Sequence, residues 1–225
     1  MAADPIRIGV LSDMSGPYAD FAGMGAVAAA ELAIEDFRKA HGAAQIELLQ
    51  ADHQNKPDIA VAIARKWYDR EGVSAIVELV HSASALAVAT AARDANKLAI
   101  ISGSSNADLF GKACTANSIY WTYDSWSLAA TLAASVVNGG GKTWFFVTSD
   151  SISGSALERD VGDAARAAGG VVVGSVRAPV NAPDMSSFLI QAQASKADVI
   201  VLALGGVDFS NALKQAQEFR IADGG

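Results

Sequence analysis

The chain has 225 residues, 51% of them hydrophobic, and a formal net charge of −7 at pH 7. This length allows one large domain or two small ones, and the apolar content predicts a folded protein with a substantial core. The Lys and Arg residues form no cluster, so we expect no nucleic-acid partner. No apolar run approaches the about 18 residues of a membrane-spanning helix, and the single cysteine, Cys114, excludes an internal disulfide.

Short apolar runs alternate with longer amphipathic or alanine-rich segments along the chain. The runs predict strands at 6–11, 45–51, 74–79, 98–102, 119–123, 143–148, 170–176 and 199–204. The longer segments predict helices at 21–40, 57–71, 83–95, 125–138, 155–168, 185–194 and 208–219. In the first helix, Met24, Val27, Ala30, Ile34 and Phe37 recur at helical spacing and are expected to face the core. Fully apolar strands that alternate with helices predict an α/β fold with parallel sheets covered on both faces.

The alternation pauses at residues 103–118, which are rich in Gly, Ser, Asn and Lys and show no regular period. We therefore predict two α/β lobes, the first at residues 1–118 and the second, partial lobe at residues 119–225. Lobes of this kind bind their ligands at the carboxyl ends of the strands.

Two glycine-rich stretches resemble nucleotide motifs but lie in the wrong context. Gly23-x-Gly25-x-x-Ala28 has dinucleotide spacing, yet its glycines fall inside the predicted helix rather than at the turn after the strand. Gly139-Gly-Gly-Lys-Thr143 has Val136 where a phosphate-binding loop needs glycine, and it precedes a strand instead of following one. We interpret the first as helix packing and the second as a turn.

No catalytic or metal motif is present. His41, His53 and His81 form no HExxH pattern, and no nucleophile has a base at a supporting spacing. Asp52 and His53 are the nearest approach to a metal pair, and a polar loop after a strand is the better interpretation. We predict a protein that is not an enzyme, with no catalytic residue, no metal and no cofactor.

Neutral hydroxyl and amide groups gather at the predicted strand ends. Capping or turn formation explains any one of these serines. Their coincidence over several loops favours a site for a small polar or anionic solute, since helix N-termini with hydroxyls attract carboxylates. The residues are Ser12, Ser15, Tyr18, His81, Ser82, Ser84, Ser102, Ser104, Ser105, Asn106, Ser149, Ser151, Ser153 and Asp208.

The opening Ile6-Arg-Ile-Gly-Val-Leu-Ser-Asp-Met-Ser-Gly-Pro-Tyr-Ala19 resembles that of ABC-transporter substrate-binding proteins of the branched-chain amino acid type. The similarity continues through Ala51-Asp-His-Gln-Asn-Lys-Pro-Asp58, Ile100-Ile-Ser-Gly-Ser-Ser-Asn106, Tyr120-Trp-Thr-Tyr-Asp124, Gly154-Ser-Ala-Leu-Glu-Arg-Asp160 and Gly205-Gly-Val-Asp-Phe209. It extends over all 225 residues. The resemblance implies the type I periplasmic binding protein fold, in which two Rossmann-like lobes close on a solute by hinge motion.

By this resemblance, the ligand-binding residues are Tyr18, Ser82, Ser84, Ser104, Ser105, Asn106, Ser151, Ser153 and Asp208. The hinge residues are Tyr120, Trp121, Thr122 and Tyr123. Tyr18 matches an aromatic residue that covers the ligand, and Ser104 matches a backbone contact to its carboxylate. Ser151 and Ser153 stand where the family commonly has aromatic residues, which disfavours a leucine-like ligand.

The resemblance implies an extracytoplasmic receptor that delivers a small carboxylate, an aromatic or other organic acid or an amino acid, to the membrane permease of an ABC importer. The segment Trp121-Thr-Tyr-Asp124 is similar to that of relatives that take aromatic or other organic acids. A periplasmic, monomeric protein is expected, whose signal peptide is absent from the start of this chain. The family pattern also implies further residues beyond Gly225, among them the acidic residue that often binds an amino group.

Two other functions fit the predicted fold. A ligand-sensing regulatory domain would require an effector domain, and a nucleotide-dependent Rossmann enzyme would require glycines at the turn after Leu11 and a catalytic base. None of these features is visible in the sequence.

Overall fold

The computed structural model describes residues 5–42 and 45–221. The chain divides between Thr122 and Tyr123 into a first and a second compact unit, which are described separately. This division lies beyond residue 118, the predicted boundary, because the short strand that follows residue 117 pairs with the sheet of the first unit.

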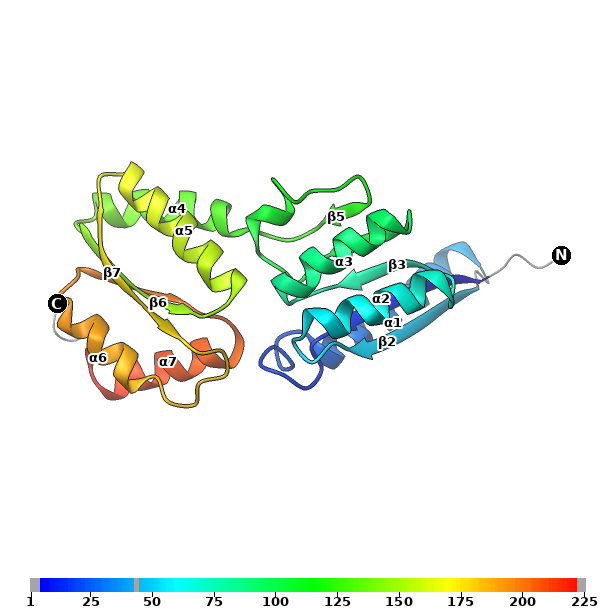
Figure 1. Cartoon of the computed structure of the whole chain (residues 1–225), viewed down its shortest axis with the longest axis horizontal. Helices are drawn as coiled ribbons and strands as arrows, with labels where there is room; N and C mark the ends of the chain where they lie inside the picture. The colour runs from blue at the N-terminus through cyan, green and yellow to red at the C-terminus, as the bar shows by residue number, and fades with distance from the viewer. Residues whose placement is uncertain (1–4, 43–44, 222–225) are drawn as a thin grey trace. The chain divides into compact units, whose positions relative to one another are not determined.

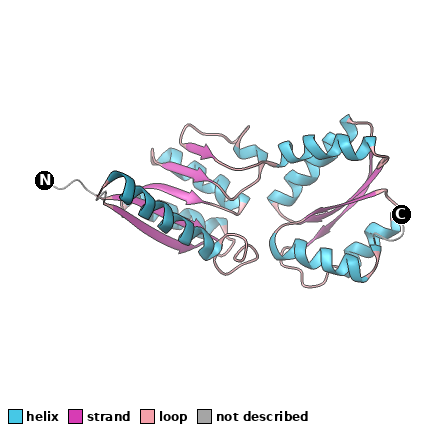
Figure 2. Cartoon of the chain, turned by 180° about the vertical axis from the view of Figure 1, so that it is seen from behind, coloured by secondary structure: helices cyan, strands magenta, loops and turns pink. Residues whose placement is uncertain are grey.

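The first unit is a five-stranded parallel sheet of order β2-β1-β3-β4-β5 (Figure 1). Its elements are β1 (Ile6–Ser12), α1 (Gly23–His41), β2 (Ile46–Asp52), α2 (Pro57–Asp69), β3 (Val73–Glu78), α3 (Ser82–Asp94), β4 (Leu98–Ile101), a 3-10 turn (Ala107–Leu109) and β5 (Ser118–Tyr120). The chain moves from β1 to β2 in one direction across the sheet and from β2 to β3 and β4 in the other. Right-handed crossovers therefore place α1 on one face and α2 with α3 on the other (Figures 1 and 2).

The core of the first unit lies between the sheet and the α2–α3 layer. Trp67 of α2 is 4% exposed and lies against Gly9 of β1, where any Cβ atom would collide with the indole ring. The neighbouring Tyr68 donates a hydrogen bond to the carbonyl of Leu98 at 2.8 Å. These contacts join α2 to both β1 and β4.

Helix α1 buries a narrower face than its sequence predicts. Val27 and Ile34 are buried as expected, but Met24 is 56% and Phe37 44% exposed. The helix packs mainly against β1 and the edge strand β2, which leaves these flanking apolar residues exposed. The Phe37 ring instead packs on His41, with ring centroids 4.5 Å apart.

The second unit is a three-stranded parallel sheet of order β7-β6-β8. Its elements are α4 (Ser125–Asn138), β6 (Thr143–Ser149), α5 (Ile152–Ala167), β7 (Val171–Ala178), α6 (Ser186–Ala194), β8 (Val199–Ala203) and α7 (Gly206–Glu218). Helices α4 and α5 cover one face, and α6 and α7 cover the other (Figure 1). Phe146 of the central strand β6 is fully buried between the two layers.

Ser125 at the first turn of α4 joins this helix to α5. Its hydroxyl donates to the Oδ2 atom of the buried Asp160 at 2.5 Å, while Arg159 donates to Oδ1 at 2.8 Å. Asp124 caps α4 by accepting a hydrogen bond from the Ser127 amide at 2.7 Å. The start of α4 is therefore fixed by both a cap and a buried carboxylate.

Substitution Ser125→Ala is expected to lower the free energy of unfolding by about 1.5–3 kcal/mol, because a hydrogen bond to a buried carboxylate is lost. Urea unfolding followed by circular dichroism measures the change. The matched control is Ser135→Ala on the exposed face of the same helix, which should stay within about 0.5 kcal/mol of the wild type. Equal losses in both variants would contradict the structural role of the Ser125 contact.

Candidate ligand-binding site

The carboxyl ends of β1, β3 and β4 lie side by side at one edge of the first sheet, because these strands are parallel neighbours. The loops that leave β1 and β4, together with the start of α3 after β3, carry most of the residues predicted to bind a ligand. This edge is the place where open α/β sheets bind ligands.

Two carboxylates of the first unit shape the loop after β1. The buried Asp13 accepts hydrogen bonds from the backbone N–H groups of Gly16 at 2.9 Å and Tyr18 at 3.0 Å. Asp52, at the end of β2, accepts from the Ser15 hydroxyl at 2.5 Å and from the Met14 amide at 3.0 Å. Burial raises the pKa of Asp52, but these hydrogen bonds and one from Gln54 lower it overall. Both carboxylates thus stabilise the loop after β1, which contains Tyr18.

Ser82 and Ser104 come together although 22 residues separate them. Ser82 opens α3 and Ser104 lies in the loop after β4, and their hydroxyl oxygens are 2.9 Å apart. The Tyr120 hydroxyl donates to the Ser104 carbonyl at 2.6 Å and fixes this loop. Ser84, in the first turn of α3, is hydrogen-bonded to His81 Nδ1 at 2.8 Å. We call Ser82 and Ser104 the serine pair.

Asn106 lies two residues after the serine pair's second member and is buried. Its Oδ1 atom accepts a hydrogen bond from the Asp108 amide at 3.0 Å, which caps the 3-10 turn. Its Nδ2 atom has no hydrogen-bond partner among the residues that the structure describes. Ser105, between Ser104 and Asn106, is partly exposed. The loop after β4 therefore presents a buried amide donor next to the serine pair.

The rings of Tyr18, His81 and His53 lie in a row at the same edge of the sheet. Tyr18 stacks with His81 at a centroid distance of 6.5 Å and an angle of 27°, and His81 lies 6.0 Å from His53. Burial lowers the pKa of both histidines, in His81 to about 4. Both imidazoles are thus neutral at pH 7. His53 accepts a hydrogen bond from the Asn55 amide through Nδ1, and its buried Nε2 atom has no partner.

Glu78, the last residue of β3, is a feature that the sequence analysis did not identify. Its side chain is buried, which raises the pKa of its carboxyl to about 7, although polar contacts with the Ser12 hydroxyl and with the Val80 and Leu79 backbone lower it in part; Asp13 adds a smaller upward effect. Glu78 and Leu79 both have positive φ angles, of 85° and 60°. A Cβ atom at Gly103 would collide with Glu78 Oε1 and the Val80 backbone. The sequence signal that could have identified Glu78 as a site residue is its acidic side chain at the end of an apolar strand.

In the second unit, the predicted residues also lie at the carboxyl end of the sheet. Ser151 caps α5 by accepting from the Gly154 amide at 3.1 Å, and its hydroxyl is 3.2 Å from that of Ser153. Asp208 is buried in the first turn of α7 and accepts from the Asn181 amide at 2.9 Å. Burial raises the pKa of this carboxyl. Asp208 therefore supports the loop after β7, whereas both serines remain partly exposed.

The predicted hinge, Tyr120–Tyr123, spans the division between the units. Tyr120 ends β5, and the amide of Trp121 still donates to the Ile101 carbonyl at 2.8 Å. The side chains of Trp121 and Tyr123 are largely exposed.

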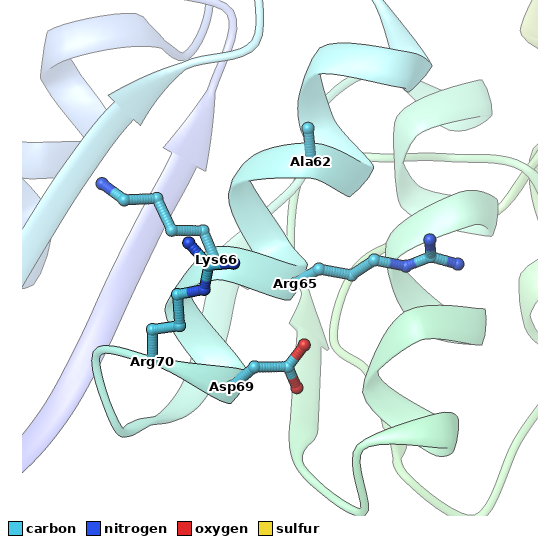
Figure 3. A pocket seen from close by; sticks show the side chains of 5 residues that line it. All are labelled: Ala62, Arg65, Lys66, Asp69 and Arg70. Carbon is cyan, nitrogen blue, oxygen red and sulfur yellow. The ribbon is translucent and has the colours of Figure 1, made fainter.

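A separate hollow of about 330 Å³ lies on the outer surface of α2 (Figure 3). Its lining residues are Ala62, Arg65, Lys66, Asp69 and Arg70. Because α2 leads from the end of β2 to the start of β3, Arg65–Arg70 lie toward the amino edge of the sheet, away from the serine pair. Within residues 5–42 and 45–221, no three His, Cys, Asp or Glu side chains are grouped to hold a metal ion, and no helix is long and apolar enough to cross a membrane.

The family model described as periplasmic binding protein matches residues 5–225. A periplasmic binding protein from Burkholderia mallei has 44% sequence identity and a TM-score of 0.93, over 99% of this chain and 59% of its own. A branched chain amino acid ABC transporter periplasmic ligand-binding protein from Burkholderia xenovorans LB400 has 41% identity and a TM-score of 0.77, over 95% of this chain and 57% of its own.

A solute binding protein of an ABC transporter from R. palustris, solved with 4-hydroxybenzoate, shares the fold with a TM-score of 0.85 at 23% identity, over 99% of this chain and 60% of its own. The comparison with curated proteins gives no match. This chain spans about 60% of the length of the solved relatives. The predicted α/β fold with parallel sheets is confirmed, and the chain belongs to the periplasmic binding protein family.

Proposed function

We propose that this chain belongs to an extracytoplasmic solute receptor of an ABC importer and that its ligand is a small carboxylate. The observation that carries the proposal is a group of donors at the start of α3 and in the loop after β4, formed by the serine pair and the Nδ2 atom of Asn106. A buried amide donor without a partner is costly unless a ligand or water supplies an acceptor.

The N-terminus of α3 adds to this donor set. His81 stands at the N-cap, but its side chain makes no hydrogen bond to the helix amides. The first N–H groups of an α-helix have no partner within the helix, and they carry a partial positive charge. A carboxylate at this position would accept hydrogen bonds from the helix and from the serine pair without any Lys or Arg.

Within the carboxylate class, we favour an aromatic or other organic acid over an amino acid. The rings of Tyr18 and His81 offer an uncharged, flat surface beside the donor group. In the loop after β1, the carboxylates of Asp13 and Asp52, which would be acceptors for an ammonium group, already accept hydrogen bonds from the loop itself. An amino acid remains the alternative ligand, since the B. xenovorans relative is a branched chain amino acid ABC transporter periplasmic ligand-binding protein.

The proposed mechanism is closure by hinge motion at Tyr120–Tyr123. The first unit would hold the carboxylate, and Ser151 and Ser153 of the second unit would complete the site and exclude water. Delivery to a membrane permease and a periplasmic location are part of this proposal, and both are supported by the family match. Micromolar affinity corresponds to about −8 kcal/mol, which a few charge-assisted hydrogen bonds and ring burial can supply.

Thermal unfolding of the chain with benzoate, 4-hydroxybenzoate, leucine, glutamate, NAD and ATP tests the proposal. A ligand at a hundredfold excess over its Kd stabilises the folded state by about 2.7 kcal/mol. We expect at least one of the carboxylates to stabilise the chain. Ser104→Ala should weaken the affinity for that carboxylate about tenfold or more, because a hydrogen bond to the ligand is lost.

The control variants are Ser74→Ala, an exposed serine on β3, and Arg70→Gln in the α2 hollow; both should bind as the wild type does. Stabilisation by NAD or ATP alone, or a loss of binding in Arg70→Gln rather than in Ser104→Ala, would contradict the proposed site.

A further inference from the structure

Glu78 combines two unfavourable features in one residue. Its side chain is only 6% exposed, and Oε2 has no hydrogen-bond partner. Its φ angle of 85° lies in the left-handed region, where a side chain is strained and glycine is favoured. Backbone strain and a buried acidic group at one residue are typical of functional sites.

The position of Glu78 connects it to the proposed carboxylate site. Its carbonyl accepts hydrogen bonds from the amides of Ser102 at 3.0 Å and Gly103 at 3.1 Å. Its carboxyl lies so close to Gly103 that no side chain fits there. Gly103 directly precedes Ser104 of the serine pair, so the carboxyl lies beneath the loop that would hold the ligand.

Among residues 5–42 and 45–221, no cation is found that balances Glu78 at this edge. Asp13 is the charged group that faces it from the loop after β1, and it disfavours a second negative charge. His53 after β2 and His81 before α3 are neutral at pH 7 because burial lowers their pKa values. Segments 12–18, 52–55, 78–84 and 102–106 contain no Lys or Arg. A proton on Glu78 itself therefore removes one negative charge from an edge where Asp13 and Asp52 also carry carboxylates.

We propose that Glu78 is a specificity-determining residue that makes ligand binding depend on a proton. The inference rests on the proposed function. The ligand carboxylate binds when Glu78 is protonated, and an ionised Glu78 repels it. At a pH where Glu78 of the free protein is ionised, binding therefore takes one proton from solvent onto its carboxylate, and an O–H bond is the only covalent bond formed.

The pH range of this effect follows from the burial of the group. Burial raises the pKa of Glu78 to about 7, so affinity should be constant below about pH 6. Above pH 7 it should weaken with each further pH unit, toward a limit of about tenfold per unit for one coupled proton.

Isothermal titration calorimetry with benzoate and with leucine at pH 6, 7.5 and 9 tests the inference. Measurement at pH 7.5 and 9 in two buffers of different ionisation enthalpy counts the protons taken up. We expect wild-type affinity to be at least about tenfold weaker at pH 9 than at pH 6, with an uptake approaching one proton. Glu78→Gln should bind with the same affinity at all three values, and Glu31→Gln, an exposed residue of α1, should keep the wild-type profile.

Wild-type binding that does not change with pH would overturn this inference and leave the proposed function intact. If neither benzoate nor leucine binds to either the wild type or Glu78→Gln at pH 6, the proposed function is contradicted, and the inference with it. A titration of the ¹³C carboxyl signals in the free wild type gives a readout without ligand or substitution. A midpoint near 7 for Glu78 supports the inference, and a midpoint below about 5 overturns it.

Discussion

Replacing Trp67 by alanine is expected to lower the free energy of unfolding of the first unit by about 3–5 kcal/mol, the range for large aromatic deletions in a packed core. The indole lies against Gly9 of the neighbouring sheet, and nearly all of its surface is buried. Urea unfolding followed by circular dichroism measures the loss. Trp126→Ala is the matched control, because this side chain on α4 is 65% exposed and should contribute less than about 1 kcal/mol.

The contact between Trp67 and Gly9 provides a second measurement of the same packing. Gly9→Ala should destabilise the wild type because its Cβ collides with the indole ring, but it should cost little in the Trp67→Ala background. The expected coupling energy is about 1–3 kcal/mol. Additive effects of the two substitutions would mean that the indole does not pack against β1.

The stability of the first unit is expected to change with pH through Glu78. Its pKa is about 7 in the folded state, against an ordinary value of 4.5 for a solvated glutamate in the unfolded chain. The folded state binds the proton more tightly, so its stability falls as pH rises from about 4.5 to 7. At pH 8 the buried charge costs about 3 kcal/mol, since one pKa unit corresponds to about 1.4 kcal/mol.

Glu78→Gln isolates this effect, because the amide resembles the protonated carboxyl but does not ionise. We expect the variant to be more stable than the wild type by about 3 kcal/mol at pH 8, and the advantage to vanish at pH 4. His81 acts in the opposite direction, since burial lowers its pKa to about 4 and stability is lost as pH falls from 6.5 to 4. The difference between variant and wild type removes this second contribution. An advantage that is the same at both pH values would contradict the assigned ionisation of Glu78.

The sequence predicted the elements well where local chemistry determines them. Helix α4 has the predicted bounds, Ser125–Asn138, because Asp124 caps its start and glycines follow its end. The prediction that Met24 and Phe37 lie in the core was wrong. The spacing of apolar residues identifies the apolar face of α1, but it does not show how much of that face the sheet covers. The strand after residue 117 was assigned to the second lobe, and only its pairing with β4 places it in the first sheet.

The location of the candidate site could be predicted from the sequence, but the contacts between its side chains could not. Parallel topology alone places Ser82, Ser104 and Asn106 at one edge of the sheet. The 2.9 Å contact between the two serine hydroxyls depends on the register of β3 with β4, which the sequence does not display. The positive φ of Glu78 was also hidden, because glycine is the usual signal for that conformation and a glutamate stands there.

Mapping of amide chemical shifts during a benzoate titration is the most direct test of the proposed carboxylate site, because two surfaces of the first unit could attract an anion. We expect the shifts to concentrate at the start of α3 and in the loop after β4, at Ser82, Ser104 and Asn106, and to saturate with one midpoint. The same shifts in a leucine titration, in place of benzoate, would identify an amino acid as the ligand at the same residues. Shifts confined to Arg65–Arg70 of the α2 hollow, or no shift with either acid, would contradict a carboxylate site at the strand ends.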